Sequence, residues 1–250
     1  RITQVDTSDI AEAARLYGEA NASALVYALD NIQQSQARDC VLSLVNLALV
    51  TGNIGKIGAG IFPMRQGANE QGASDVGCVP DRLPGYRRVS NAEDRQALEA
   101  LWDTSISDVP GLGLTTIIES AAAGQIKSMF LIGDSPNFTN GKLGDGLSAL
   151  DKLEFLVVCD SFMSQTAQRA DVVLPRVTFA EKDGTYTNLE RRIQRLKPGR
   201  KLPEVGARPE WQVICDVAHK MGAPGFIQAS PSETMDEIAR VAPMYANVSY

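Results

Sequence analysis

The sequence predicts an α/β protein built around a mostly parallel sheet. Short apolar runs alternate with segments of helical periodicity along much of the chain, and this alternation is typical of β–α–β units. It is clearest in the second half, where the apolar runs 128–132, 155–158 and 171–174 are separated by helical segments. These runs are almost continuously apolar, as expected of strands that are buried on both faces of a parallel sheet.

The first part of the chain predicts two helices on either side of one strand. Residues 7–20 are expected to form a helix, because polar residues can cap its start and apolar residues recur on one face. The apolar run 24–29 is expected to be a buried strand. Residues 36–50 are expected to form a long helix, which Gly52 can end in the left-handed conformation.

The remaining helices are expected from the same periodicity. Their apolar residues recur three and four positions apart, so that each helix can cover a sheet with one face. The expected segments are 92–102, 114–123, 143–153, 164–170, 209–221 and 232–241.

The stretch 52–85 shows no periodicity and is rich in glycine, asparagine and glutamine. Long aperiodic loops inside compact proteins are usually either functional or disordered. Apolar residues among the glycines argue against plain disorder, so this stretch is a candidate functional loop.

Arg65 is the candidate charged group of this loop. A guanidinium beside flexible glycines such as Gly67 can bind a carboxylate or a phosphate with two hydrogen bonds. Asn69 and Gln71 add amide donors. The alternative, which the sequence leaves open, is that Arg65 caps a helix end or pairs with Glu70.

Polar residues also follow the three clearest strands, at the points where those strands end. Ligands of open parallel sheets lie just beyond the carboxyl ends of the strands. Short polar side chains there can hydrogen-bond a ribose or a base edge, and a glycine allows close approach of the backbone. Ordinary turns use the same residue types, so that alternative stays open. The candidates are Gly133, Asp134, Ser135 and Thr139 after the first strand, Cys159 and Asp160 after the second, and Arg176 and Thr178 after the third.

Charge and cysteine usage exclude several classes of protein. The 250 residues carry a net charge of −6, so we expect no nucleic-acid partner and no anionic membrane partner. No apolar run is long enough for direct membrane insertion. The four cysteines are widely spaced, so we expect no metal ligands within this stretch and a reducing, cytoplasmic location.

Several ordered motifs resemble one known family. The stretches 51–56, 64–77 and 84–86 resemble the alpha subunits of formate dehydrogenases, within the wider molybdopterin oxidoreductases of the dimethyl-sulfoxide-reductase type. The second half is similar to the same family at 131–136, 160–175, 181–194 and 209–211. The element 181–194 is similar to the family pattern E-x-x-G-T-x-x-N-x-E-x-R-x-Q. The resemblance covers the chain from about residue 24 onward.

This resemblance implies Rossmann-like, doubly wound lobes: the end of one lobe in residues 1–67 and most of a second in 68–250. It implies a bis-molybdopterin guanine dinucleotide with molybdenum or tungsten, and a 4Fe-4S cluster outside this stretch. The partners it implies are N- and C-terminal domains of the same polypeptide and iron–sulfur or diaphorase subunits. We expect the stretch alone to be inactive.

The resemblance also implies roles for the candidate residues. Arg65 is then a catalytic residue near the metal that helps to hold a carboxylate substrate. The guanosine lies near the strand-end residues, and Asp171 joins them. The residues implied to bind the cofactor are Gly67, Asn69, Gln71, Gly133, Asp134, Ser135, Thr139, Cys159, Asp160, Asp171, Arg176 and Thr178.

The loop departs from the family pattern, which usually reads Arg-Gly-(Gln or Gly)-Asn-Asn where this chain has Arg-Gln-Gly-Ala-Asn at 65–69. None of the four cysteines falls at the family's metal-ligand segment. Such departures suit a relative that kept the fold without the chemistry, so the alternative is a scaffold or electron-transfer role like that of the large subunit of NADH-quinone oxidoreductase. A third alternative is an unrelated doubly wound domain, such as the central domain of thiamine-diphosphate enzymes. The 52–86 loop and the 185–194 element do not fit that domain.

Overall fold

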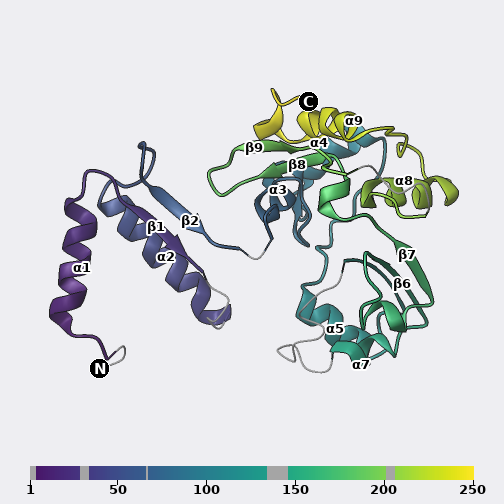
Figure 1. Cartoon of the computed structure of the whole chain (residues 1–250), viewed down its shortest axis with the longest axis horizontal. Helices are drawn as coiled ribbons and strands as arrows, with labels where there is room; N and C mark the ends of the chain where they lie inside the picture. The colour runs from purple at the N-terminus through teal and green to yellow at the C-terminus, as the bar shows by residue number, and fades with distance from the viewer. Residues whose placement is uncertain (1–3, 29–33, 66, 134–145, 201–205) are drawn as a thin grey trace. The chain divides into compact units, whose positions relative to one another are not determined.

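The chain divides into two compact units in a computed structural model that describes residues 4–28, 34–65, 67–133, 146–200 and 206–250 (Figure 1). The first unit comprises residues 1–71 and 187–192, and the second comprises 72–186 and 193–250. The expected domains 1–67 and 68–250 stay a prediction, because a compact unit is not by itself a functional domain. No helix in the described ranges is long and apolar enough to cross a membrane.

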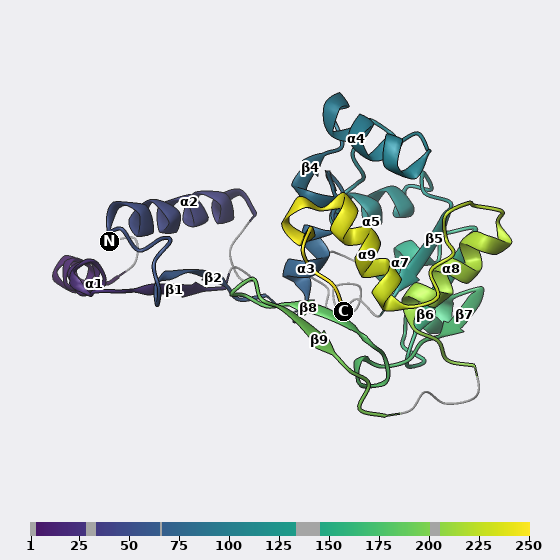
Figure 2. The same ribbon diagram turned by 90° about the horizontal axis from the view of Figure 1, so that it is seen from above.

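The first unit contains two helices and a two-stranded parallel sheet. Helices α1 (Thr7–Glu19) and α2 (Gln34–Val50) accompany strands β1 (Ala24–Tyr27) and β2 (Gly60–Pro63). Helix α2 runs along the strand pair in both views (Figures 1 and 2). The buried Asn53 accepts a hydrogen bond from the backbone of Ser23 at 3.0 Å and thereby joins the end of α2 to the start of β1.

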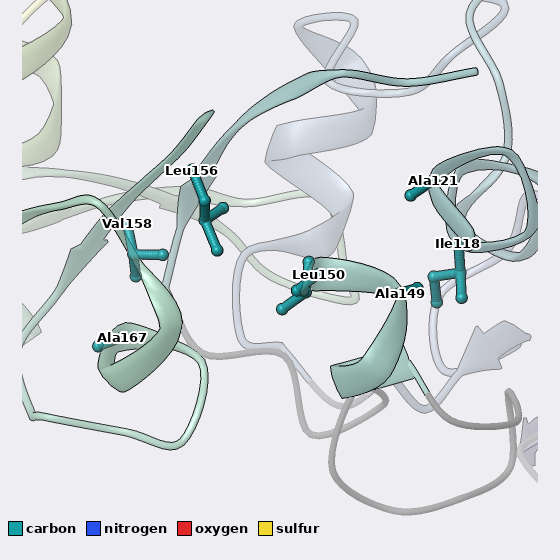
Figure 3. Close-up of a cluster of buried hydrophobic side chains, with 7 residues drawn as sticks. All are labelled: Ile118, Ala121, Ala149, Leu150, Leu156, Val158 and Ala167. Atoms are coloured by element: carbon teal, nitrogen blue, oxygen red, sulfur yellow. The ribbon is translucent and has the colours of Figure 1, made fainter. Parts of the chain in front are cut away.

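The second unit is organised around a three-stranded parallel sheet in the order β5–β6–β7. Its strands are β5 (Ser128–Ile132), β6 (Phe155–Asp160) and β7 (Val172–Pro175). Helices α5 (Leu114–Ala122) and α7 (Gly146–Leu150) bury apolar side chains against it (Figure 3). The buried cluster consists of Ile118, Ala121, Ala149, Leu150, Leu156, Val158 and Ala167.

A smaller core of the second unit consists of Met235, Ala242 and Tyr245, with Ile193, Ile238, Val248 and Tyr250 packed against it. Helix α3 (Glu70–Asp75) crosses the boundary between the units. The remaining elements are β3 (Arg82–Leu83), η1 (Pro84–Tyr86), β4 (Arg87–Arg88), α4 (Ala92–Trp102), η2 (Ala167–Arg169), η3 (Phe179–Glu181), β8 (Gly184–Thr187), β9 (Ile193–Leu196), α8 (Glu210–Lys220), α9 (Pro231–Val241) and η4 (Pro243–Tyr245).

The structure confirms a mixed α/β fold with small parallel sheets. Three local predictions were wrong. The stretch 52–85 contains β2, α3, β3 and η1 rather than a single loop, and 164–170 contains only a 3₁₀ turn. The strand expected at 24–29 forms as β1 but is not buried, since Val26 is 63% exposed. In the described residues the spatial order of the strands, β5–β6–β7, follows their order in the sequence without a reversal. A doubly wound sheet requires a reversal of strand order, so that finer prediction stays a prediction.

Candidate nucleotide edge of the parallel sheet

The carboxyl ends of β5, β6 and β7 meet at one edge of the sheet. The register pairs Ile132 with Cys159, and Asp160 with Pro175. Beyond the strands, the backbone N–H of Gly133 donates to the carbonyl of Cys159 at 2.8 Å. The N–H of Arg176 donates to the carbonyl of Asp160 at 3.1 Å. Gly133, Asp160 and Arg176 are thus fixed side by side, and we call this the strand-end site.

Gly133 has a backbone conformation that favours glycine, with φ at +86°. A Cβ atom at this position would lie 3.4 Å from Nη2 of Arg176, in van der Waals contact with it. The glycine therefore keeps the backbone open beside the guanidinium.

Arg176 is the cation of the strand-end site. Its Nη1 donates to Oε1 of Glu210 at 2.7 Å. Its Nε is buried and has no hydrogen-bond partner among the described residues. The nearest acidic atom of Asp160, Oδ1, lies 4.0 Å from Nε, which is within ion-pair range but too far for a hydrogen bond. A buried donor without a partner is unusual in a folded protein, and it leaves hydrogen-bonding capacity for a ligand.

The contacts of Asp160 and Cys159 in the structure are made mainly with other residues of the protein. The buried carboxylate of Asp160 accepts hydrogen bonds from the backbone of Ser161 at 2.6 Å and from the hydroxyl of Ser164 at 2.9 Å. Burial, and then the nearby charge of Glu210, raise the pKa of the Cys159 thiol. Cys159 therefore offers its carbonyl, not a thiolate, to the strand-end site.

Asp171 and Thr178 also have structural partners. Asp171 precedes β7, and its Oδ2 accepts from the backbone N–H of Leu156 at 2.7 Å, near the start of β6. It therefore lies at the amino end of the sheet, about 13 Å from the carboxyl edge for a four-residue strand. Thr178 forms a capping box with Glu181 at the start of η3. The structure does not bring Asp171 to the strand-end site.

Three predicted residues of this edge, Asp134, Ser135 and Thr139, lie outside the described residues.

The first unit holds the other candidate group. Nη1 of Arg65 lies 3.6 Å from Oε2 of Glu70, and both side chains are about two-fifths exposed. Oε1 of Glu70 accepts from the backbone N–H of Gly67 at 2.9 Å. The pairing of Arg65 with Glu70, left open as an alternative by the sequence, is therefore present. Such an exposed pair contributes little stability and can be exchanged for another carboxylate.

Asn69 anchors the same loop. Its side-chain oxygen accepts from the backbone N–H of the buried Thr187 at 2.8 Å, across 118 positions of sequence. This contact joins the loop to the element 181–194. Gln71 lies within α3 and is partly buried.

Sequence reasoning missed Glu210 and Lys182, which complete the charge cluster at the strand-end site. Nζ of Lys182 donates to both carboxylate oxygens of Glu210, at 2.8 and 2.6 Å. The available signal was a carboxylate at the first residue of a helix, where the helix dipole favours negative charge. In the described ranges, no group of three or more His, Cys, Asp or Glu side chains could hold a metal ion.

By its fold, then, the chain is a mixed α/β protein with small parallel sheets and a glycine–arginine pair at one sheet edge. Residues 15–220 match the molybdopterin oxidoreductase family model. The chain belongs to the molybdopterin oxidoreductase family.

Known relatives agree with this membership. The chain is 40% identical over 248 residues to a probable oxidoreductase of Bacillus subtilis, covering 99% of this chain and 25% of that protein. It is 39% identical to the alpha subunit of an F420-dependent formate dehydrogenase of Methanococcus maripaludis, covering 100% of this chain and 36% of the relative. The chain thus spans about a quarter to a third of these relatives.

A solved structure has a similar fold. Acetylene hydratase from Pelobacter acetylenicus superposes with a TM-score of 0.65 and 15% sequence identity. The match covers 98% of this chain and 36% of that one. At this identity the likeness concerns the fold alone.

Proposed function

We propose that this chain is part of a molybdopterin oxidoreductase of the formate dehydrogenase type, and that the strand-end site holds a guanosine end of a bis-molybdopterin guanine dinucleotide with Mo or W. Family membership supports a molybdenum- or tungsten-pterin cofactor in the whole protein. Relatives named as formate dehydrogenases support the reaction type. The activity of the whole protein is a proposal, because the chain spans only part of those relatives.

The observation that carries the proposal is the pairing of Gly133 with Arg176. A guanidinium can donate two hydrogen bonds to guanine O6 and N7, or to a phosphate. The buried Nε of Arg176 has no hydrogen-bond partner among the described residues, so a ligand that reaches it would satisfy this donor. The missing side chain of Gly133 leaves the backbone accessible beside it. These residues fit the nucleotide part of the cofactor.

Arg65 is proposed as the residue that holds the carboxylate substrate. Its exposed pair with Glu70 can open because water screens both charges. A bound formate would then replace the Glu70 carboxylate as the partner of the guanidinium.

The cofactor, when bound, supplies the two-electron oxidation chemistry. The proposed contribution of this chain is to bind and orient the dinucleotide through Gly133 and Arg176, and to neutralise the substrate charge through Arg65. Electrons would leave through a 4Fe-4S cluster elsewhere in the polypeptide and through iron–sulfur or diaphorase subunits. We place the whole protein in the cytoplasm.

The test is analysis of the full-length protein, purified anaerobically from a host that makes the cofactor. Bound guanine dinucleotide, stoichiometric Mo or W and formate-dependent dye reduction are expected. Protein from such a host without dinucleotide or metal would favour the scaffold role of the NADH-quinone oxidoreductase large subunit.

A further inference from the structure

The start of α8 is fixed beside the exit of β7. The backbone N–H of Arg208 donates to the carbonyl of Pro175 at 3.2 Å, and the N–H of Val177 donates to the carbonyl of Arg208 at 3.2 Å. Glu210 follows two residues later as the first residue of α8. These backbone hydrogen bonds therefore bring Glu210 close to Arg176 independently of any contact between their side chains.

The carboxylate of Glu210 lies between two cations. Its side chain is 15% exposed, and those of Arg176 and Lys182 are 27% and 25% exposed. Burial alone would raise the pKa of Glu210, but hydrogen bonds from Lys182 and Arg176 bring that pKa below its ordinary value. Glu210 is therefore charged at neutral pH and bridges both cations.

This bridge determines which atoms of Arg176 face the ligand side. Glu210 takes Nη1, so the planar guanidinium is turned with Nη2 toward Gly133 and Nε toward Asp160. A guanidinium has a rigid fork of donors, so fixing one nitrogen orients the others. Without Glu210, Arg176 could turn toward Asp160, and Lys182 would become an uncompensated cation nearby.

We infer that Glu210 is a positioning residue, which orients Arg176 at the strand-end site so that its remaining donors meet the guanosine or its phosphate; this rests on the proposed function. Lys182 donates hydrogen bonds to the Glu210 carboxylate and compensates its remaining negative charge. Neither Glu210 nor Lys182 needs to touch the nucleotide for this role.

The experiment is a double-mutant cycle in the full-length protein, purified from a host that makes the cofactor. The variants are Arg176→Ala, Glu210→Gln and the double variant. The readout is the rate at which bound guanine dinucleotide, measured as guanine, is lost during dialysis. Asp216→Asn is the matched control. It also removes a carboxylate from α8, but the carboxylate of Asp216 pairs with Arg208 and not with Arg176. Circular dichroism checks that each variant is folded.

Each single variant is expected to lose guanine about ten- to a hundredfold faster, the range for a charged hydrogen bond. The double variant should lose guanine no faster than Arg176→Ala, since Glu210 acts through Arg176. A purely structural role predicts additive losses, and that result would overturn the inference. If Glu210→Gln does not fold, Glu210→Ala replaces it, because it also removes the carboxylate, and a guanine loss rate equal to wild type would contradict the role.

The Arg176→Ala variant separates this inference from the proposed function. Unchanged guanine retention in Arg176→Ala would overturn both. Faster loss in Arg176→Ala together with wild-type retention in Glu210→Gln would overturn only the positioning role of Glu210.

Discussion

Tyr245 donates its phenol hydrogen to Oδ2 of Asp75 at 3.1 Å, although 170 positions separate them. Both residues are only 3% exposed. Tyr86 donates to the other oxygen of the same carboxylate at 2.6 Å. Asp75 therefore joins α3, η1 and η4 within the second unit.

Tyr245→Phe should lower the free energy of unfolding by about 1.5–3 kcal/mol, because it removes a buried hydrogen bond to a charged group. Tyr86→Phe is the matched control, since it removes a bond to the same carboxylate from a partly exposed ring whose place water can take. Urea unfolding of both variants measures the difference. Equal losses would show that burial does not decide the strength of these bonds.

Gly133→Ala should destabilise the protein by about 1–2 kcal/mol from the left-handed backbone alone. It should also lower the content of bound guanine dinucleotide, because the new methyl group would occupy the space beside Nη2 of Arg176. Gly124→Ala shares the positive φ but has open space around it, so it should show the strain without the guanine loss. Thermal unfolding and guanine analysis check both; equal guanine content in the two variants would count against the strand-end site.

The strands of the central sheet could be predicted from the sequence because each is an apolar run. Only β6 is largely buried, however, and β5 exposes alternate side chains such as Phe130 and Ile132, so the expectation of burial on both faces was wrong for β5. Strands β8 and β9 were missed, since their sequences GTYT and IQRL lack such a run. Asp171 precedes β7, so it lies at the amino end of the sheet, although the family resemblance had grouped it with the residues at the carboxyl end. Glu210 could not be assigned from local pattern, because its partner Arg176 is 34 positions away in sequence.

The contribution of Glu210 to stability should depend on pH. Its folded-state pKa is lowered from the ordinary 4.5, so its stabilising effect is fully present above that pH and is lost as the pH falls through the folded pKa. Wild type should therefore be more stable than Glu210→Gln at pH 7, and the gap should close in acid. Melting temperatures across this range test the prediction, and a gap that is independent of pH would contradict it.

Arg65→Ala should reduce formate oxidation by the full-length enzyme about a hundredfold or more, the scale for losing one group that stabilises developing charge. Glu70→Gln keeps an acceptor for Gly67 but removes the competing charge, so it should retain activity. Steady-state dye reduction measures both variants. Full activity in Arg65→Ala would remove Arg65 from the proposed substrate site.

The most direct measurement of the proposed nucleotide site is an experimental structure of the full-length protein with its cofactor. We predict a guanosine or its phosphate within hydrogen-bonding distance of Arg176, beside Gly133 at the carboxyl edge of β5, β6 and β7. A structure in which every guanosine lies elsewhere, with this edge covered by protein, would contradict the central claim.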